Sequence, residues 1–356
     1  MNAPTRIAVP GLVRIKGGAL ARLGVYLARG CCRRVLVLAS ERLPEPIVTA
    51  ARAGLAAEGV EIAGWIEAAD NSFEAATAAF AGLPRKIAAV VGLGGGKALD
   101  MAKYLAFLAR LPYYAAPTSL SNDGFCSPQS SLTIAGRRRS LAAAPPQGVV
   151  VDVDQCLAAP RLLWLSGVGD LVSKLSAVQD WKLAFHARGE AVDDLAALLS
   201  DATVHQFLDR PLFDAQSMTL LATALMLNGI AMEICGSSRP ASGSEHLISH
   251  ALDAHSVRPR LHGLQVGVAT YLMCRLQGVQ RPQQAEAADT VAALFRATGF
   301  WDAVRADPFV RDEWLAAARL APAIKEDFYT VLSSRDCLPE ITALVDGDPT
   351  LAGCFV

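Results

Sequence analysis

The stretch KIAAVVGLGGGKALDMAKYLAFLAR, residues 86–110, decides the fold. Its first part, residues 86–93, is a short aliphatic run typical of strands that are buried on both faces. Residues 97–110 have the amphipathic pattern of a helix, and three consecutive glycines join the two segments. Glycine allows a sharp turn and close approach of a ligand, and the N-terminus of the following helix attracts anions. We favour a phosphate-binding turn over a plain strand-to-helix turn, although the spacing is neither GxGxxG nor a P-loop.

The same alternation of strand and helix patterns extends to both sides of this stretch. Such alternation predicts a parallel sheet covered by helices. Further strands are predicted at residues 34–40, 60–66, 113–117 and 148–153, helices at 44–58 and 72–82, and a hairpin over 130–134 and 139–143 that turns at Gly136.

Strand patterns disappear after about Pro160, and apolar residues then recur at helical spacing. We therefore predict an α/β domain with a parallel sheet over residues 1–158 and an all-α domain over 159–356, a division that suits a chain of this length. Ligand sites often lie in a cleft between two such lobes. The apolar stretch 220–236 contains Asn228 and Glu233, so we interpret it as a buried helix of the all-α domain.

Composition excludes several classes of function. Hydrophobic residues make up 52% of the chain, charged residues make up 19%, and the formal net charge is −1. A large core is therefore expected, and a nucleic-acid partner is not, because no basic stripe is present. The N-terminus lacks a signal-peptide pattern and the cysteines form no CxxC pairs, which predicts a cytoplasmic protein without membrane insertion.

A polar turn, PTSLSNDG at residues 117–124, follows the predicted strand 113–117. Loops at the carboxyl ends of parallel strands meet at the ligand crevice of such sheets. The hydroxyls, amide and carboxylate of this turn suit a nicotinamide or a polyol. An ordinary loop with Asn-Asp turn chemistry explains the same residues equally well.

A candidate metal site comes from four histidines gathered between residues 246 and 262. His246 and His250 are four residues apart and share one face of a helix. His262 lies nearby, and two of these histidines with one carboxylate would supply the three protein ligands of a catalytic divalent metal with one open position. Asp170, before a predicted helix 171–187, is the best carboxylate. The alternatives are a helix-capping aspartate and satisfied core histidines.

Several segments together resemble the sn-glycerol-1-phosphate dehydrogenase family of the iron-containing alcohol dehydrogenase and dehydroquinate synthase superfamily. Between residues 14 and 273 they read RIKGGALARLG, GLGGGKALDMAKYLA, PTSLSNDGFCSPQSSL, GVGDLVSKLSAVQDW, GSSRPASGSEHLISHALD and LHGLQVGVATYLM. The resemblance implies a Rossmann-like N-terminal domain and a helical C-terminal domain. It also implies an NAD(P)-dependent oxidoreductase that interconverts dihydroxyacetone phosphate and sn-glycerol 1-phosphate. One divalent metal is implied, with zinc expected first and iron or nickel as alternatives.

The resemblance also assigns roles to individual residues. The metal ligands are Asp170, His246 and His262, and the substrate contacts are Asp123, Asp170 and His250. Asp123 and His250 are the catalytic candidates, and the proton relay is either His250 or a chain of water held by the metal. The cofactor contacts are Gly94, Gly95, Gly96, Lys97, Ala98, Thr118, Ser119, Leu120, Ser121 and Ser127, while Leu120 and Cys126 depart from the small residue and serine usual in the family.

The expected partner is a small phosphorylated polyol or ketone, whose phosphate requires cationic donors. Arg239, Lys174 and the run 137–139 are candidates for this contact, and Arg239 is equally suited to a structural ion pair. A homo-oligomer is expected. Three alternatives stay open: another glycerol or phosphopolyol dehydrogenase, a dehydroquinate synthase-like carbocyclic lyase, and a non-enzymatic descendant of the fold.

Overall fold

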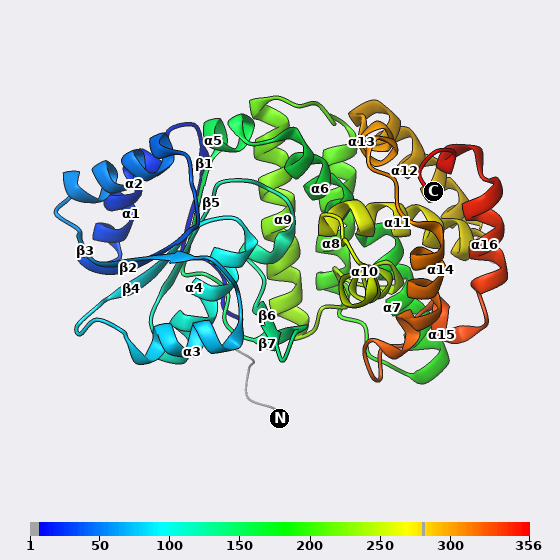
Figure 1. Cartoon of the computed structure of the whole chain (residues 1–356), viewed down its shortest axis with the longest axis horizontal. Coiled ribbons are helices and arrows are strands. Elements are labelled where there is room, and N and C mark those ends of the chain that lie inside the picture. Colours follow the sequence, from blue (N-terminus) through cyan, green and yellow to red (C-terminus); the bar gives the residue numbers. More distant parts are fainter. Residues whose placement is uncertain (1–6, 280–281) are drawn as a thin grey trace. The chain divides into compact units, whose positions relative to one another are not determined.

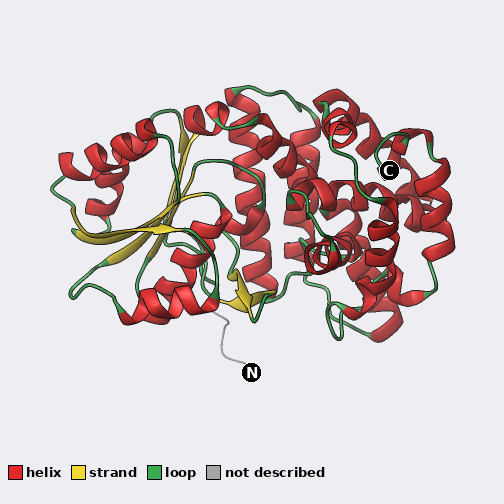
Figure 2. Ribbon diagram, viewed as in Figure 1, coloured by secondary structure: helices red, strands yellow, loops and turns green. Residues whose placement is uncertain are grey.

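The computed structural model describes residues 7–279 and 282–356. The chain forms two compact units. The first contains the residues up to Pro160 together with Asp214–Glu233, and the second contains Arg161–Phe213 and Ile234–Val356. Figure 2 shows the strands of the first unit and the helices of the second.

A parallel six-stranded sheet forms the centre of the first unit, in the order β1-β8-β5-β4-β2-β3. The predicted parallel sheet is confirmed. The edge strand β1 was not predicted, because five residues with two cations carry little strand signal; it pairs with β8 from Leu12 opposite Gly148 onwards. The strands are β1 Leu12–Lys16, β2 Arg34–Ser40, β3 Glu61–Ala68, β4 Ala89–Gly94, β5 Tyr113–Pro117 and β8 Gly148–Asp152.

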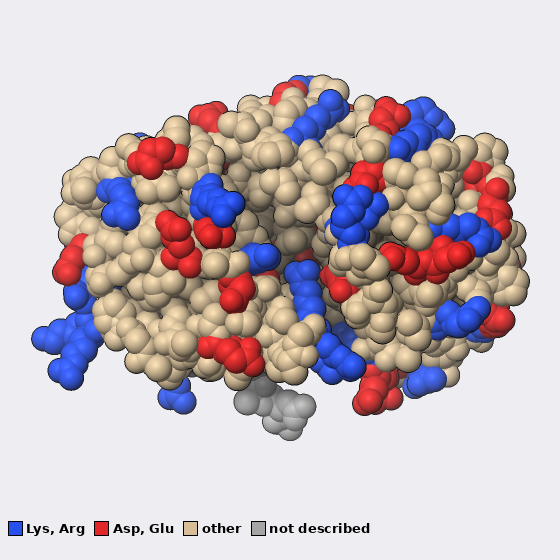
Figure 3. Space-filling view, in the orientation of Figure 1, with Lys and Arg blue, Asp and Glu red and all other residues tan. Residues whose placement is uncertain are grey.

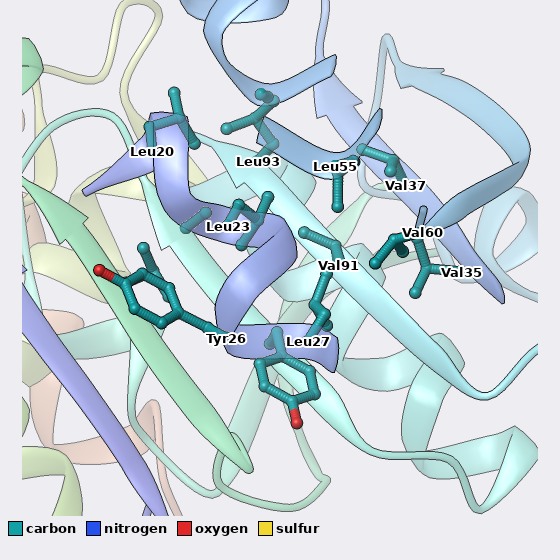
Figure 4. Close-up of a cluster of buried hydrophobic side chains, with 14 of the residues drawn as sticks. Leu20, Leu23, Tyr26, Leu27, Val35, Val37, Leu55, Val60, Val91 and Leu93 are labelled. Carbon is teal, nitrogen blue, oxygen red and sulfur yellow. The ribbon is translucent and has the colours of Figure 1, made fainter. Parts of the chain in front are cut away.

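Helices cover both faces of this sheet (Figure 1). On one face lie α1 (Leu23–Arg29) and α2 (Glu45–Ala57), and on the other lie α3 (Phe73–Ala81) and α4 (Gly96–Ala109). Figure 4 shows the core on the α1 and α2 face, where Leu23, Leu27, Leu55, Val37 and Val91 are each at most 1% exposed. Burying each such side chain contributes about 1.5–3 kcal/mol. The short elements are η1 Leu20–Arg22, η2 Asp123–Phe125, α5 Val153–Ala158 and the predicted antiparallel hairpin, β6 Gln129–Ile134 with β7 Arg137–Ala142.

Helix α9, Ala215–Cys235, groups with the first unit as far as Glu233. It is the one helix among the described residues that is long and apolar enough to cross a membrane; 56% of its most apolar window is buried within the structure. We predicted a buried helix of the all-α domain, and that placement is wrong. Gly229 explains the difference, because a Cβ there would lie 2.6 Å from the Cys126 carbonyl carbon, so α9 packs directly on the backbone of the first unit.

The second unit is helical, and α11 (His262–Gly278) is buried along most of its length. The predicted helix 171–187 is instead divided at Ser173 into α6 (Arg161–Val172) and α7 (Lys174–Arg188). The Asp170 carbonyl accepts hydrogen bonds from Ser173 Oγ and Lys174 Nζ, which compete with continuation of the helix. The other helices are α8 Asp194–Leu208, α10 Ser244–His255, α12 Pro282–Thr298, α13 Phe300–Ala306, α14 Arg311–Leu320, η3 Ala321–Ala323, α15 Val331–Ser334, α16 Leu338–Gly347 and η4 Pro349–Leu351.

Charged side chains are mixed on the surface. On the face seen in Figure 3, lysines and arginines are interspersed with aspartates and glutamates. This agrees with the near-zero net charge.

Candidate functional site

Three helices of the second unit bring Asp170, His246 and His262 together. One ligand atom from each residue lies within 4.8 Å of the others. His246 Nε2 is 3.5 Å and His262 Nε2 is 3.8 Å from Asp170 Oδ1. Asp170 lies in the last turn of α6, His246 lies in the first turn of α10, and His262 begins α11. The three residues predicted as metal ligands therefore share one point in space.

Two glycines allow this convergence. A Cβ added to Gly263 would lie 1.7 Å from the Ser166 carbonyl oxygen, and one added to Gly169 would lie 2.0 Å from the Gly263 oxygen. The Gly263 amide also donates to Ser166 Oγ at 3.1 Å. Helices α6 and α11 therefore cross with their backbones in contact. Because each glycine adjoins a ligand in the sequence, the contact places Asp170 beside His262.

Glu245 fixes the orientation of the His246 ring. Its Oε1 lies 2.8 Å from His246 Nδ1 and accepts the Gly243 amide at 2.6 Å, while its Oε2 accepts from Ser176 Oγ at 2.7 Å. Glu245 is completely buried. A carboxylate at Nδ1 holds the proton there and turns the Nε2 lone pair toward Asp170, as behind histidine ligands of metals.

Ser249 does the same for His262 through a hydroxyl group. Ser249 Oγ lies 3.0 Å from His262 Nδ1 and donates to Gln265 Oε1 at 2.7 Å. Because the hydroxyl proton goes to Gln265, the oxygen accepts the Nδ1 proton of His262. In the neutral rings both protons therefore lie on Nδ1, which leaves Nε2, the atom nearest Asp170, as the nitrogen that can bind a metal.

The electrostatics keep the carboxylate ionised. Burial alone would raise the pKa of Asp170, but the Lys174 ammonium and the His246 ring outweigh it and hold that pKa well below its ordinary value. Burial opposes charge on His246, yet hydrogen bonds to Asp170 and Glu245 raise its pKa to about 9. Without a metal the ring therefore also holds a proton on Nε2 at neutral pH, and a metal bound there would displace that proton. One carboxylate oxygen and two imidazole nitrogens form a donor set that fits a divalent transition metal.

His250 lies beside this cluster. Its ring centroid is 6.3 Å from that of His246 and 5.9 Å from that of His262, and it stacks on His262 at an interplanar angle of 26°. It is half-buried. The imidazole predicted as a proton relay therefore adjoins the three candidate ligands.

The glycine turn of the first unit has a backbone that only glycine adopts readily. Gly94 has a φ of +133°, and a Cβ there would lie 2.2 Å from Ser40 Oγ. The Gly95 amide donates to Ser40 Oγ at 2.9 Å, and α4 begins at Gly96. Lys97, which is exposed, and Ala98, which is buried, thus lie in the first turn of a helix, where amide groups are available to an anion.

The polar turn after β5 adjoins the glycine turn, because the Thr118 amide donates to the Gly94 carbonyl at 3.1 Å. Asn122 caps the short helix η2 by accepting from the Gly124 amide. Thr118, Ser119, Ser121 and Asp123 are half-buried, while Leu120 and Ser127 are buried at 1% and 6% exposure.

The candidate phosphate contacts have different surroundings. Arg239 forms a two-pronged pair with Glu190, at 2.7 Å and 2.5 Å, and lies 3.8 Å from the centroid of the Phe328 ring. Its role in the structure is thus that of an ion-pair residue. Lys174 is completely buried against Asp170. The run 137–139 lies exposed on β7, where Arg138 bonds Ser131 Oγ.

Sequence reasoning missed the residues that support the site, namely Glu245, Ser249, Gln265 and Lys103. Glu245 adjoins His246 in the chain, which is a usable signal. Ser249 lies three residues after His246 on the same helix, but nothing in the sequence shows which ring it faces.

Comparison with known proteins places the chain among dehydrogenases. A family model described as iron-containing alcohol dehydrogenase matches residues 14–160. The glycerol-1-phosphate dehydrogenase, NAD(P)+, of Thermofilum pendens is 40% identical over 282 residues, which are 77% of this chain and 80% of that protein. The enzyme of the same name from Aeropyrum pernix is 35% identical over 338 residues, which are 93% of this chain and 94% of that protein.

Solved structures show the same fold. A probable glycerol dehydrogenase from Sinorhizobium meliloti matches with a TM-score of 0.75 and 19% identity, over 96% of this chain and 99% of that one. The maleylacetate reductase of Agrobacterium tumefaciens matches with a TM-score of 0.74 and 17% identity, over 97% of this chain and 98% of that one. The predicted fold class, an α/β unit followed by helices, is confirmed.

Proposed function

Because the chain belongs to the glycerol-1-phosphate dehydrogenase family, we propose that it is a metal-dependent NAD(P)-linked oxidoreductase that interconverts dihydroxyacetone phosphate and sn-glycerol 1-phosphate. The observation that carries the proposal is the cluster of Asp170, His246 and His262, whose ligand atoms lie within 4.8 Å of one another. A protein that had lost this chemistry would have no need to keep an acceptor behind each imidazole.

In this proposal Asp170 and the Nε2 atoms of His246 and His262 hold one divalent metal, with zinc first and iron or nickel as alternatives. A metal there supplies Lewis acidity toward the ketone oxygen of the substrate. Lys174 balances the charge of Asp170, at 3.7 Å from its Oδ2. His250 contacts the substrate and relays the proton, since an imidazole titrates near neutral pH.

The first unit binds the dinucleotide in this proposal. The turn Gly94–Gly96, with Lys97 and Ala98, receives the pyrophosphate at the N-terminus of α4. The polar turn receives the nicotinamide side through Thr118, Ser119, Leu120, Ser121 and Ser127, with Asp123 on the substrate. We retain residues 1–158 as the dinucleotide domain and 159–356 as the metal-and-substrate domain, except for Asp214–Glu233, which belongs to the first compact unit. We also expect a cytoplasmic homo-oligomer.

The decisive experiment follows nicotinamide absorbance with dihydroxyacetone phosphate, with and without a chelator. We expect oxidation of NADH or NADPH that the chelator abolishes and added metal restores. Chiral analysis of the product must give the 1-phosphate rather than the 3-phosphate. Turnover of free glycerol or another phosphopolyol alone, or carbocycle formation without net change in absorbance, would replace the proposed reaction by one of the alternatives.

A further inference from the structure

Lys103 is a buried ammonium that the proposed chemistry does not use. It lies on α4, two turns after the glycine turn, and is 1% exposed. Its Nζ donates to the Gly124 and Gln129 carbonyls, both at 2.6 Å, and lies 3.3 Å from Ser127 Oγ. These acceptors all belong to the segment that continues the polar turn into β6.

Burying this charge is costly, so its partners must compensate. Burial lowers the pKa of Lys103, and the nearby Asp100 carboxylate opposes that change. Asp100 Oδ1 lies 3.5 Å from Nζ and one helical turn earlier on α4. A buried ion pair of this kind contributes little net stability compared with apolar packing, but it fixes the geometry of the groups it contacts.

The same segment is held from a second side. Helix α9 packs on it through Gly229, where an added Cβ would lie 2.6 Å from the Cys126 carbonyl carbon and 2.9 Å from the Ser127 amide nitrogen. Residues 124–129 therefore lie between a charged anchor on α4 and a backbone contact on α9. The anchor is specific to Lys103, because only a long cationic side chain reaches two carbonyls while remaining charged.

We propose that Lys103 is a positioning residue, which holds the polar turn in register with the glycine turn and so determines the affinity for the dinucleotide. The inference rests on the proposed function for its ligand. The two turns already meet at the hydrogen bond from the Thr118 amide to the Gly94 carbonyl. Lys103 extends this connection to the far end of the polar turn, since its own helix begins at Gly96.

Loss of the ammonium leaves two part-buried carbonyls without their charged donor, and polar groups shielded from water are costly to leave unpaired. The turn then populates conformations in which Ser121 and Asp123 are displaced. The apparent dissociation constant rises in inverse proportion to the fraction of molecules that keep the competent turn.

The test compares wild-type protein with Lys103→Met and Asp100→Asn, and uses Lys182→Met as the matched control because Lys182 is exposed on α7. Hydrogen exchange of the unliganded chain should become faster over residues 118–131 in both test variants. The Kd for NADH or NADPH, measured by nicotinamide fluorescence below every melting temperature, should rise about tenfold or more in Lys103→Met, equivalent to about 1.4 kcal/mol. Zinc affinity should not change. If Lys103→Met does not fold, the same exchange and Kd measurements on Asp100→Asn provide the test, because that variant removes the carboxylate that pairs with the Lys103 ammonium.

Unchanged exchange and unchanged Kd in a folded test variant would overturn the proposal. Faster exchange with an unchanged Kd would also reject it, because Lys103 would then stabilise the turn without affecting the dinucleotide. If the wild-type protein itself bound no dinucleotide, the proposed function would fail, while the exchange data would still decide whether Lys103 holds the turn.

Discussion

Replacing Glu245 by glutamine should weaken metal binding without removing a ligand. Glutamine keeps the shape of the side chain but loses its charge, so the contact at 2.8 Å to His246 Nδ1 no longer polarises the ring toward the metal. Substitution of a residue behind a histidine ligand typically costs 10- to 100-fold in metal affinity. We expect about tenfold, because the amide oxygen of glutamine can still accept the Nδ1 proton, and tenfold corresponds to about 1.4 kcal/mol.

Two measurements check this expectation. Competition with a chromophoric chelator gives the affinity for zinc and cobalt directly. Thermal unfolding with and without metal gives the free energy by which a saturating concentration of metal stabilises the folded protein. In Glu245→Gln this free energy should be smaller by about the same 1.4 kcal/mol, because it depends on the affinity of the folded state for the metal. The unfolding of the metal-free variant shows whether the fold itself is intact.

The matched control is Ser200→Ala on α8. Ser200 is completely buried, and its Oγ makes no hydrogen bond within the described residues, so this variant also removes a buried polar group. Ser249→Ala should weaken metal binding through His262, whereas Ser200→Ala should not. Equal metal affinity in wild-type and Glu245→Gln protein, both folded, would refute the argument that Glu245 orients a ligand.

Three further perturbations test the site and its surroundings. His262→Ala should lose metal and turnover together, and full activity with metal retained would remove His262 from the ligand set. Asp123→Ala should leave metal content and fold intact while it lowers kcat/KM at least about tenfold, as removal of a positioned acid or base does; unchanged kinetics would exclude its role. Burial and the Glu245 charge raise the pKa of Asp180 from 3.8 to about 6. The folded state therefore binds the Asp180 proton more tightly than the unfolded state does. The resulting contribution to the free energy of unfolding, about 3 kcal/mol, is fully present below pH 4 and is lost as the pH rises through 6. Chemical denaturation between pH 4 and 6 should show that the free energy of unfolding changes less with pH in Asp180→Asn than in the wild-type protein, whatever the absolute stability of the variant. An identical pH dependence in the two proteins would contradict the raised pKa of Asp180.

The sheet could be predicted because a strand buried on both faces leaves a continuous aliphatic run. Residues 34–40 and 113–117 were predicted with the bounds that β2 and β5 have in the structure. β1 could not be predicted in this way, since it is partly exposed along Leu12–Ile15 and mixes cations with aliphatic residues. Its pairing with β8 depends on a contact across the whole α/β segment, which no local pattern encodes.

The candidate ligands could be predicted from residue type and motif, but the elements that carry them could not. Asp170 lies in the last turn of α6 rather than before a helix, because the Ser173 and Lys174 side chains donate to its carbonyl and the helix stops at Val172. Hydropathy likewise predicted α9 as a helix but not the unit to which it packs. That choice depends on Gly229, whose missing side chain matters only once the Cys126 backbone is adjacent.

Gly263 tests whether the crossing of α6 and α11 sets the site. A Cβ at Gly263 would lie 1.7 Å from a carbonyl oxygen of α6, so Gly263→Ala must separate the two helices. Overpacking of this kind typically costs 1–3 kcal/mol, and we expect about 3 kcal/mol because the obstacle is backbone and not a flexible side chain. The separation should also move His262 from Asp170 and weaken zinc binding.

Gly347 on α16 is the matched control, because a Cβ there would meet nothing within 4 Å. Gly347→Ala should be neutral or should stabilise by up to about 1 kcal/mol, since alanine loses less conformational freedom in a helix. Chemical denaturation and zinc competition on both variants decide the question. If Gly263→Ala matched Gly347→Ala in both measurements, backbone contact between α6 and α11 would not be what holds the aspartate and the histidine together.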